Sequence, residues 1–374
     1  MADESSITIV TSRFRDGGVE RLMNRLAAGF LEQGVACHFV LGEDGAEGAA
    51  ATIPNGVDVR VADEGGVLDT LSDLVAELGS RRHVVLIVRT TDCAPVLRRL
   101  RRMGPRCPAA FILAGDYLTP RLQRSGFGRL KAWKYRHRIR RYWRRADGII
   151  STDPNITTDW ANTGMFGATP IHTVAPPVVG PELDRDSHDS VPHPWFDESA
   201  PVILGVGRLT PNKRFELLLA ALARLSDCRD IRLIILGRGP EEERLQSLAE
   251  QWGLTGRVDF PGYSRNPYAW MRRANVLALP SRVEPFGLVL IESLYLGTPF
   301  VAAGTPSGPR SIHQATGQGY LLMQDTAEEL ASAIVRVLNS QHDASAMRRA
   351  AEAYDYRVSS REYLRVMLSS RDTS

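Results

Sequence analysis

Strand-like and helix-like segments alternate twice along this chain, and this alternation limits its fold more than any other feature. In the first half, apolar runs such as "ITIVTS", "VACHFVLG" and "HVVLIVRT" accompany an amphipathic segment, "VERLMNRLAAGFLEQG", which ends at Gly34, a typical helix C-cap. The runs "AAFILAGD", "DGIISTD" and "PIHTVAPP" continue the series. Strands that alternate with helices form parallel sheets, so the pattern predicts an α/β fold.

The alternation begins again at residue 201 with "PVILGVGRL", "RFELLLAALARLSD" and "IRLIILGRGP". A chain of 374 residues is too long for one ordinary core and fits two domains. We therefore predict two doubly wound parallel-sheet domains that face each other across a cleft, with ligands beyond the carboxyl ends of the strands. The predicted parts are a first domain (1–180), a polar, proline-rich linker (181–200), a second domain (201–354) and a C-terminal helix that packs back towards the first domain (355–374).

Composition excludes several classes of protein. The net charge of +3 is small for this length, which argues against a general nucleic-acid binder. The start, "MADESSITIV", has no basic leader, and no later segment approaches the roughly 18 apolar residues of a membrane span, so we expect a cytoplasmic protein. Cys37, Cys93, Cys107 and Cys228 show no CxxC spacing, which favours reduced, buried thiols over a disulfide framework or a zinc site.

A loop with two cations follows the first strand of the second half. In "GVGRLTPNKRFELLLAAL", Arg208 and Lys213 lie between that strand and a helix, whose N-terminus carries partial positive charge. Cations and backbone N–H groups at one point suit a diphosphate, and each charge-assisted hydrogen bond contributes about 1.5–3 kcal/mol. A solvated basic loop is the alternative interpretation of this motif alone.

Two glutamates flank a Pro-Phe-Gly turn in "VEPFGLVLIE". The turn predicts a helix start near Gly287, which leaves Glu284 in the loop and Glu292 in the second helical turn. The N–H groups of Phe286, Gly287 and Leu288 would lie at the helix start, available to an anion or a sugar hydroxyl. The arrangement therefore predicts polyol recognition, although the spacing also fits a capped helix with one buried and one exposed glutamate.

In chain order, the segments "GGVERLMNRLAAGFLEQG", "GVGRLTPNKRFELLLAAL", "LIILGRGPEEERL", "RVDFPGYSRNP", "ANVLALPSRVEPFGLVLIESLYLGTPFVA" and "GPRSI" form one set. The set resembles the retaining nucleotide-sugar glycosyltransferases of family four, which have the GT-B fold of two Rossmann-like domains. The resemblance covers nearly the whole chain. It is strong from Gly205 to about Leu338, and in the first half it rests mainly on the Gly-Gly loop.

The resemblance implies roles for individual residues. Arg208 and Lys213 would neutralise the donor diphosphate. Glu284 would contact hydroxyls of the donor sugar, and Glu292 would bind the nucleotide ribose. The remaining implied contacts are the Gly17–Gly18 loop, closing over the phosphates, the backbone N–H groups of Phe286, Gly287 and Leu288, and four residues that border the nucleobase, namely Gly237, Arg238, Gly239 and Tyr263.

The implied catalysis is electrostatic, because the cations stabilise charge on the departing nucleotide diphosphate. The resemblance implies retention by same-face attack, with the leaving phosphate taking the acceptor proton, so no glycosidase-like carboxylate pair is needed. Many relatives carry a histidine near the sugar where this chain has Gly115 and Asp116. Asp116 either takes over a sugar contact or caps a turn. Pro176 replaces the asparagine of the family's interdomain "N-P" element.

The sequence predicts no metal site and no bound cofactor. Asp184, Arg185 and Asp186 form a D-x-D like the metal motif of another glycosyltransferase fold, but they fall in the linker without a preceding strand. His188 and His193 lack a third ligand at zinc spacing. "GVGRLT" and "GRGPEE" lack the third glycine of a dinucleotide fingerprint. We therefore expect a metal-independent enzyme whose donor is a nucleotide diphosphate sugar, with UDP favoured over GDP.

Residues 129–145, "RLKAWKYRHRIRRYWRR", form the most basic stretch of the chain, with nine Lys or Arg residues. One helical stripe runs through Ala132, Tyr135, Ile139, Tyr142 and Ala146. A basic amphipathic helix with Trp133 and Trp143 at its edges suits an anionic bilayer surface, where each basic group contributes about 1 kcal/mol. The alternatives are a domain helix with a solvated basic face, or an RNA-binding helix. With "RRLRRMGPR" nearby, the charge favours a membrane-bound or pyrophosphate-bearing acceptor over nucleic acid.

The predicted function is transfer of a hexose or N-acetylhexosamine to a glycan or lipid-linked acceptor in cell-envelope polysaccharide, lipopolysaccharide or glycolipid assembly. Such an enzyme would be cytoplasmic or peripheral at the inner face of the cytoplasmic membrane. The rival is a non-catalytic module that binds nucleotide sugars or glycans with the same fold. The presence of Arg208, Lys213, Glu284 and Glu292 favours the enzyme.

Overall fold

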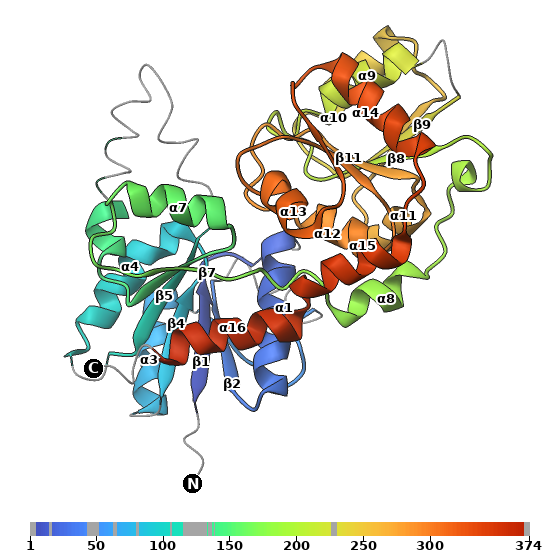
Figure 1. Cartoon of the computed structure of the whole chain (residues 1–374). Coiled ribbons are helices and arrows are strands. Elements are labelled where there is room, and N and C mark those ends of the chain that lie inside the picture. Colours follow the sequence, from blue (N-terminus) through green and yellow to red (C-terminus); the bar gives the residue numbers. More distant parts are fainter. Residues whose placement is uncertain are drawn as a thin grey trace. The chain divides into compact units, whose positions relative to one another are not determined.

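The structure is a computed structural model, which describes residues 5–14, 17–42, 52–62, 66–79, 82–104, 107–114, 133, 137, 139–225 and 230–369. The chain divides into two compact units, formed by residues 1–178 with 354–374 and by residues 179–353. Each unit contains one parallel sheet flanked by helices (Figure 1). The two doubly wound parallel sheets predicted from the sequence are thereby confirmed.

The first unit has a seven-stranded sheet of order β3-β2-β1-β4-β5-β6-β7. Its strands are β1 (Ser6–Thr11), β2 (Ala36–Leu41), β3 (Asp58–Val61), β4 (His83–Ile87), β5 (Ala109–Ala114), β6 (Gly148–Ser151) and β7 (Ile171–Thr173). Its helices are α1 (Gly18–Glu32), α3 (Val67–Leu78), α4 (Thr90–Arg101), α7 (Pro154–Asn162) and α16 (Tyr356–Ser369). The strand order reverses between β1 and β4, because β2 and β3 lie on one side of β1 and the later strands on the other.

Both faces of this sheet are buried. Ile9 and Leu86 pack in the cluster that contains α1 and α16 side chains, whereas the neighbouring Val10 and Ile87 pack in the cluster with α3 and α4. Successive side chains of a strand point to opposite faces, so both sets must be apolar. Burial on both faces explains why these strands are continuous apolar runs in the sequence.

The C-terminal helix α16 is part of the first unit and lies beside α1 (Figure 1). Tyr363 and Met367 of α16 are fully buried. The Tyr356 hydroxyl donates a hydrogen bond to the Glu32 carboxylate of α1. Burial and this bond raise the pKa of Tyr356 to about 12. The last helix of the chain therefore completes the core formed by the first elements.

The second unit has a six-stranded sheet of order β10-β9-β8-β11-β12-β13. Its strands are β8 (Val202–Val206), β9 (Arg232–Leu236), β10 (Val258–Gly262), β11 (Val276–Leu279), β12 (Phe300–Ala303) and β13 (Tyr320–Leu322). The helical elements are α8 (Pro181–Ser187), η3 (Pro194–Phe196), α9 (Phe215–Leu225), α10 (Glu242–Gln251), α11 (Pro267–Arg273), α12 (Leu288–Tyr295), α13 (Pro309–Thr316), α14 (Ala327–Asn339), α15 (Ala344–Ala351) and η4 (Glu352–Tyr354), which ends at the unit boundary. Among the described helices of the whole chain, none combines the length and the apolar character that a bilayer crossing requires.

Residues 181–200, predicted as a linker, instead contain α8 and η3 and belong to the second unit. Leu183 of α8 is fully buried. The Asp184 carboxylate accepts hydrogen bonds at 2.7 Å from Arg348 Nη2 and from the Tyr295 hydroxyl. Partial burial acts to raise the pKa of Asp184, but the bonds from Arg348 and Tyr295 hold it below its usual value. The polar composition of the segment gave no sign of these contacts, because only a few of its side chains take part in them.

Candidate active site

The sheet of the second unit reverses its strand order between β8 and β11, and the loops after these strands hold the main predicted site residues. Arg208 and Lys213 follow β8, whereas Glu284 follows β11. Ligands of doubly wound sheets bind beyond the carboxyl ends of the strands at such a reversal. The fold therefore places the predicted cations and the predicted carboxylate at the edge of the sheet where a ligand is expected.

Lys213 and Glu284 form the central contact of this edge. Lys213 Nζ lies 2.5 Å from Glu284 Oε2, although the residues are 71 positions apart. Ser281 Oγ donates to the same carboxylate oxygen at 3.1 Å. The Glu284 side chain is 10% exposed and the Lys213 side chain 21%, so the pair is largely shielded from water. The sequence analysis gave these two residues separate roles and did not predict that they pair.

Arg208 lies in the same loop as Lys213 but differs from it in environment. A Cβ atom on Gly207 would lie 3.3 Å from Lys213 Cε, so the lysine stem passes next to the backbone that precedes Arg208. Arg208 itself is exposed, and within the ranges given above it makes no ion pair. Its charge is therefore available to an anion from solvent.

Hydrogen bonds join the loop after β8 to the loop after β11. Asn212 Nδ2 donates to the Val283 carbonyl at 2.7 Å, and the Arg282 N–H donates to the Asn212 carbonyl at 2.8 Å. Arg214, with a left-handed φ of 54°, donates to Asp325 Oδ2 at 2.7 Å and is buried. Because the turn is fixed on both sides of Lys213, the ammonium is held in place before any ligand binds.

Helix α12 begins at Leu288, which confirms the predicted start, and Gly287 is its N-cap with a left-handed φ of 88°. Glu292 is 3% exposed and Phe286 is 7% exposed. Glu284 is also buried, so the alternative of one buried and one exposed glutamate is wrong. Burying a carboxylate is costly unless it is paired or hydrogen-bonded, and Glu284 meets this condition through Lys213 and Ser281.

A loop after β12 supports the turn that carries Glu284, a contact that the sequence did not predict. Ser307 Oγ donates to the Glu284 carbonyl at 3.3 Å. Gly308 has a φ of 54°, and a Cβ atom there would lie 2.5 Å from the Phe286 carbonyl oxygen. The run "GTPSGPR" was the sequence signal for this loop, because paired glycines around Ser307 permit such a close approach.

Residues 237–239, predicted to border a nucleobase, follow β9 and lie against the Arg208 loop. The Leu209 N–H donates to the Arg238 carbonyl at 2.9 Å. The side chains of Arg238 and Tyr263 are exposed, the tyrosine by 45%. These groups are accessible to a ligand, and their contact with a base stays a prediction.

Among the glycines that the structure describes, Gly237 leaves the least room for a side chain. Its φ is 150°, and a Cβ atom would lie 1.9 Å from the Gly207 carbonyl oxygen. We expect Gly237→Ala to lower the free energy of unfolding by about 2–4 kcal/mol, because strain and overpacking add. Gly256→Ala is the matched control, since Gly256 has a φ of 81° with no atom within 4 Å of the added Cβ. Equal losses in urea unfolding of the two variants would show that the contact with Gly207 is unimportant.

In the first unit, Gly17 is the N-cap of α1 and Gly18 is its first residue. Glu20, in the first turn of α1, is 6% exposed and its Oε1 lies 2.7 Å from Arg89 Nη2. Arg89 Nε also donates to Thr11 Oγ1 at the end of β1, at 3.0 Å. The sequence did not predict this partly buried ion pair, because its members are 69 positions apart. A phosphate contact of the glycine loop stays a prediction.

Gly115 and Asp116 lie outside the described residues, so the two alternatives for Asp116 both remain predictions. The D-x-D in α8 has other partners: Asp184 pairs with Arg348, and Asp186 with Arg185. Within the part of the chain that is described, no group of three or more His, Cys, Asp and Glu side chains is arranged to hold a metal ion.

The structure describes Trp133, His137 and residues 139–145 of the basic segment. Trp143 is 2% exposed and stacks on Phe166 with ring centroids 5.5 Å apart. The prediction that Trp143 is available to a bilayer is therefore wrong, because this side chain belongs to the core of the first unit. Ile139 is buried as well, so the apolar stripe of this segment faces the protein where it is described.

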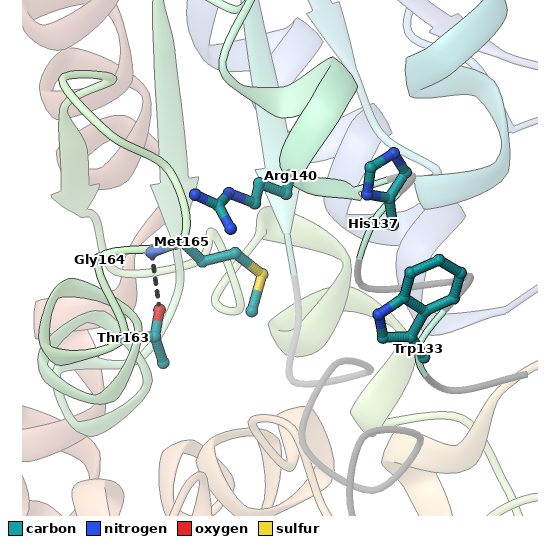
Figure 2. Close-up of a pocket in the computed structure, with 6 residues that line it drawn as sticks. All are labelled: Trp133, His137, Arg140, Thr163, Gly164 and Met165. Carbon is teal, nitrogen blue, oxygen red and sulfur yellow. Dashed lines mark hydrogen bonds between the residues drawn. The ribbon is translucent and has the colours of Figure 1, made fainter. Parts of the chain in front are cut away.

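Trp133, by contrast, is 60% exposed, and its ring stacks on His137 with centroids 5.7 Å apart. Figure 2 shows these two rings on one side of a hollow of about 330 Å³, with Thr163 and Met165 on the other. Arg140 and Gly164 complete the lining. The basic segment therefore combines a buried face with an exposed face that carries aromatic and cationic groups.

The second unit matches a known family. Residues 190–354 match the family model described as glycosyl transferases group 1. The chain is 33% identical over 200 residues to the lipopolysaccharide core biosynthesis glycosyltransferase LpsE of Rhizobium meliloti, covering 53% of this chain and 55% of the relative. It is 35% identical over 128 residues, 34% of each chain, to a Campylobacter jejuni N-acetylgalactosaminyltransferase whose name gives a diphospho-undecaprenol acceptor.

Solved structures extend the likeness to the whole chain. Anabaena HepE, crystallised with UDP and glucose, superposes with a TM-score of 0.73 over 97% of this chain and 99% of its own, at 19% identity. At that identity the likeness supports the fold alone. The sequence alignments span about half of LpsE and a third of the Campylobacter relative. Residues 190–354 therefore match the glycosyl transferases group 1 family, and the fold of the chain is the GT-B fold.

Proposed function

We propose that this chain is a retaining, metal-independent glycosyltransferase that moves a hexose or N-acetylhexosamine from a nucleotide diphosphate sugar to a glycan or lipid-linked acceptor. The single observation that carries the proposal is the largely shielded Lys213–Glu284 pair at the strand reversal of the second unit. An ammonium and a carboxylate held together there can serve the two chemical parts of such a donor, its diphosphate and its sugar hydroxyls. The family match supports the same chemistry.

Lys213 can serve the diphosphate without leaving Glu284. A lysine ammonium has three N–H donors, so one bond to Glu284 Oε2 leaves two for phosphate oxygens. Arg208 adds a second cation that is accessible from solvent. As the bond between sugar and phosphate breaks, negative charge grows on the departing diphosphate, and these cations stabilise it. Glu284 then accepts hydrogen bonds from sugar hydroxyls, and Glu292 from the ribose.

The relatives support a class of donor and a class of acceptor. HepE binds UDP, which supports a UDP-sugar over a GDP-sugar. LpsE acts in lipopolysaccharide core biosynthesis, and the Campylobacter enzyme uses a lipid-linked acceptor. We therefore place this chain in lipopolysaccharide, exopolysaccharide or glycolipid assembly, in the cytoplasm or at the inner face of the cytoplasmic membrane.

The test is release of nucleoside diphosphate from a panel of UDP- and GDP-sugars, measured with and without a lipid-linked oligosaccharide extract and with a chelator. We expect slow release with a UDP-sugar alone, faster release with the acceptor, and no effect of the chelator. NMR of the product should show the anomeric configuration of the donor. Binding of the nucleotide sugar without any release would instead support the rival, a non-catalytic binding module.

The exposed face of the basic segment leads to a prediction about membranes. Trp133 is exposed and lies in a stretch rich in Lys and Arg, a combination suited to the surface of an anionic bilayer. We expect the protein to sediment with vesicles that contain phosphatidylglycerol and to be released as salt rises, because the Debye length is about 8 Å at physiological ionic strength. Trp133→Ser should weaken sedimentation several-fold. Trp252→Ser, another exposed tryptophan, is the control, and equal effects of both would contradict this orientation.

A further inference from the structure

A hollow of about 650 Å³ in the first unit is lined almost entirely by arginines. Its lining consists of Arg98, Arg101, Arg102, Arg141, Tyr142 and Arg145, which we call the arginine pocket. Three of the arginines come from the end of α4, and the other two from the helical residues 139–143 and the turn that follows. Two elements that are about 40 positions apart in the sequence thus bring five guanidinium groups to one place.

Only one of these arginines pairs with a carboxylate among the described residues. Arg101 Nη2 lies 3.0 Å from Asp147 Oδ2, and its Nε donates to the Arg145 carbonyl at 3.0 Å. Asp147 Oδ2 also accepts a hydrogen bond from the Ala110 N–H of β5 at 2.8 Å. Arg101 and Asp147 therefore fasten the end of α4 to the sheet. The other four positive charges repel one another, which favours an anion in the pocket.

Tyr142 orients two of the remaining arginines without neutralising them. Arg98 Nη2 donates to the Tyr142 hydroxyl at 2.7 Å. The guanidinium carbons of Arg98 and Arg145 lie 5.3 and 5.8 Å from the centre of the Tyr142 ring. Guanidinium groups present several N–H donors in a planar fork, a geometry that matches phosphate oxygens. The pocket is therefore partly pre-organised for phosphate.

Stabilisation of a helix end does not account for this arrangement. Cations in the last turn of α4 interact favourably with its dipole, and this explains Arg98 and Arg101. Arg141 and Arg145 lie in another segment, whose opposite face is buried through Ile139 and Trp143. Their presence opposite the end of α4 adds repulsion to that site, so it needs a different reason.

The arginine pocket continues towards the hollow of Figure 2. A third hollow of about 370 Å³ shares Arg141 and Arg145 with the arginine pocket, and shares His137 and Arg140 with the hollow beside Trp133. The series therefore leads from a cationic end to an aromatic end. Aromatic surfaces next to a few polar groups are typical of sites for the organic part of a ligand.

We propose that the arginine pocket binds a diphosphate ester, and that the hollow beside Trp133 and His137 receives the organic group attached to it. A diphosphate carries enough oxygens to bond several guanidinium forks at once, and a 650 Å³ hollow is larger than one phosphate requires. The arginine pocket belongs to the first unit, and the Lys213–Glu284 edge belongs to the second. The assignment rests on the proposed function only in naming a lipid-linked acceptor as the source of the diphosphate.

The test is calorimetric titration of the full chain with inorganic pyrophosphate, in an Arg208→Ala/Lys213→Ala background that removes the proposed donor site. We expect binding to persist in this background and to weaken about tenfold or more when Arg102→Gln and Arg141→Gln are added, because two charge-assisted contacts are lost. Arg361→Gln with Arg365→Gln, two exposed arginines of α16, is the matched control and should change nothing. Unchanged thermal unfolding will show that the variants fold.

Further titrations distinguish a lipid diphosphate from free pyrophosphate and from a phospholipid headgroup as the ligand. Farnesyl diphosphate in detergent should bind in the same background and lose affinity on Trp133→Ser, whereas pyrophosphate should not. The proposal would be overturned if the affinity for pyrophosphate did not change in the Arg102→Gln/Arg141→Gln variant. It would also be overturned if these changes weakened only the binding of the protein to phosphatidylglycerol vesicles. If pyrophosphate binds as expected but no nucleoside diphosphate is released from any nucleotide sugar, the proposed function is contradicted and the assignment of the arginine pocket stands.

Discussion

Lys213→Ala is expected to lower the turnover of sugar transfer by about a hundredfold or more, and to weaken binding of the free nucleoside diphosphate by about tenfold or more. Lys213 is the cation that the structure holds against Glu284, 2.5 Å away and only 21% exposed. Charge in such a shielded position acts strongly on a departing diphosphate. Arg208→Ala should have the same direction of effect with a smaller magnitude, because Arg208 is exposed.

The same change should also destabilise the second unit. Removing Lys213 leaves the buried Glu284 carboxylate without its counter-ion, which costs about 3 kcal/mol in comparable pairs. Lys213→Met combined with Glu284→Gln should restore most of the stability and none of the turnover, which separates the two effects. Arg272→Ala, an exposed arginine on α11, is the control. Full turnover and unchanged diphosphate affinity in Lys213→Ala would remove the donor-site assignment.

Glu284→Gln should lower turnover by about a hundredfold, because it removes a charged acceptor from the sugar hydroxyls while keeping the size of the side chain. The ion pair adds a second expectation. Without the carboxylate charge, Lys213 no longer divides its attraction between Glu284 and the phosphates. The affinity for the sugar-free nucleoside diphosphate should therefore be unchanged or tighter in this variant.

Glu292→Gln is the matched comparison, since Glu292 is also buried and lies eight positions along the chain. If Glu292 binds the ribose, the variant should weaken the sugar-free nucleotide by about tenfold, the loss of one charge-assisted bond. Steady-state kinetics and calorimetry on the two variants distinguish the roles. Equal weakening of the nucleotide by both changes contradicts the assignment.

The two sheets were predictable because their strands are buried on both faces, as Ile9 and Val10 of β1 illustrate, and such strands appear as apolar runs. The attachment of residues 181–200 to the second unit was not. This attachment depends on the burial of Leu183, on the ion pair of Asp184 with Arg348, and on similar long-range contacts. No local sequence pattern predicts such contacts. Composition predicted a linker where tertiary contacts formed a helix.

The candidate site likewise has features that the sequence could predict and features that it could not. Arg208, Lys213, Glu284 and Glu292 could be selected from the sequence by residue type and position in the loops. Their geometry could not, because the Lys213–Glu284 bond joins positions 71 apart. The supporting contact of Ser281 was likewise not predictable, since a serine in a loop has no distinctive pattern, whereas the loop of Ser307 had a signal in its paired glycines.

The most direct measurement of the central claim is calorimetric titration of the pure chain with UDP, GDP and ADP, repeated with Arg208→Ala/Lys213→Ala. The proposed donor site predicts a binding event that is tighter for UDP than for GDP and ADP and that is lost in the double variant, in which any diphosphate binding that remains belongs to the arginine pocket. An intact, folded chain that gives no heat with any of the three nucleotides, or a UDP signal that persists unchanged in the double variant, would contradict the claim that the Lys213–Glu284 edge binds the donor.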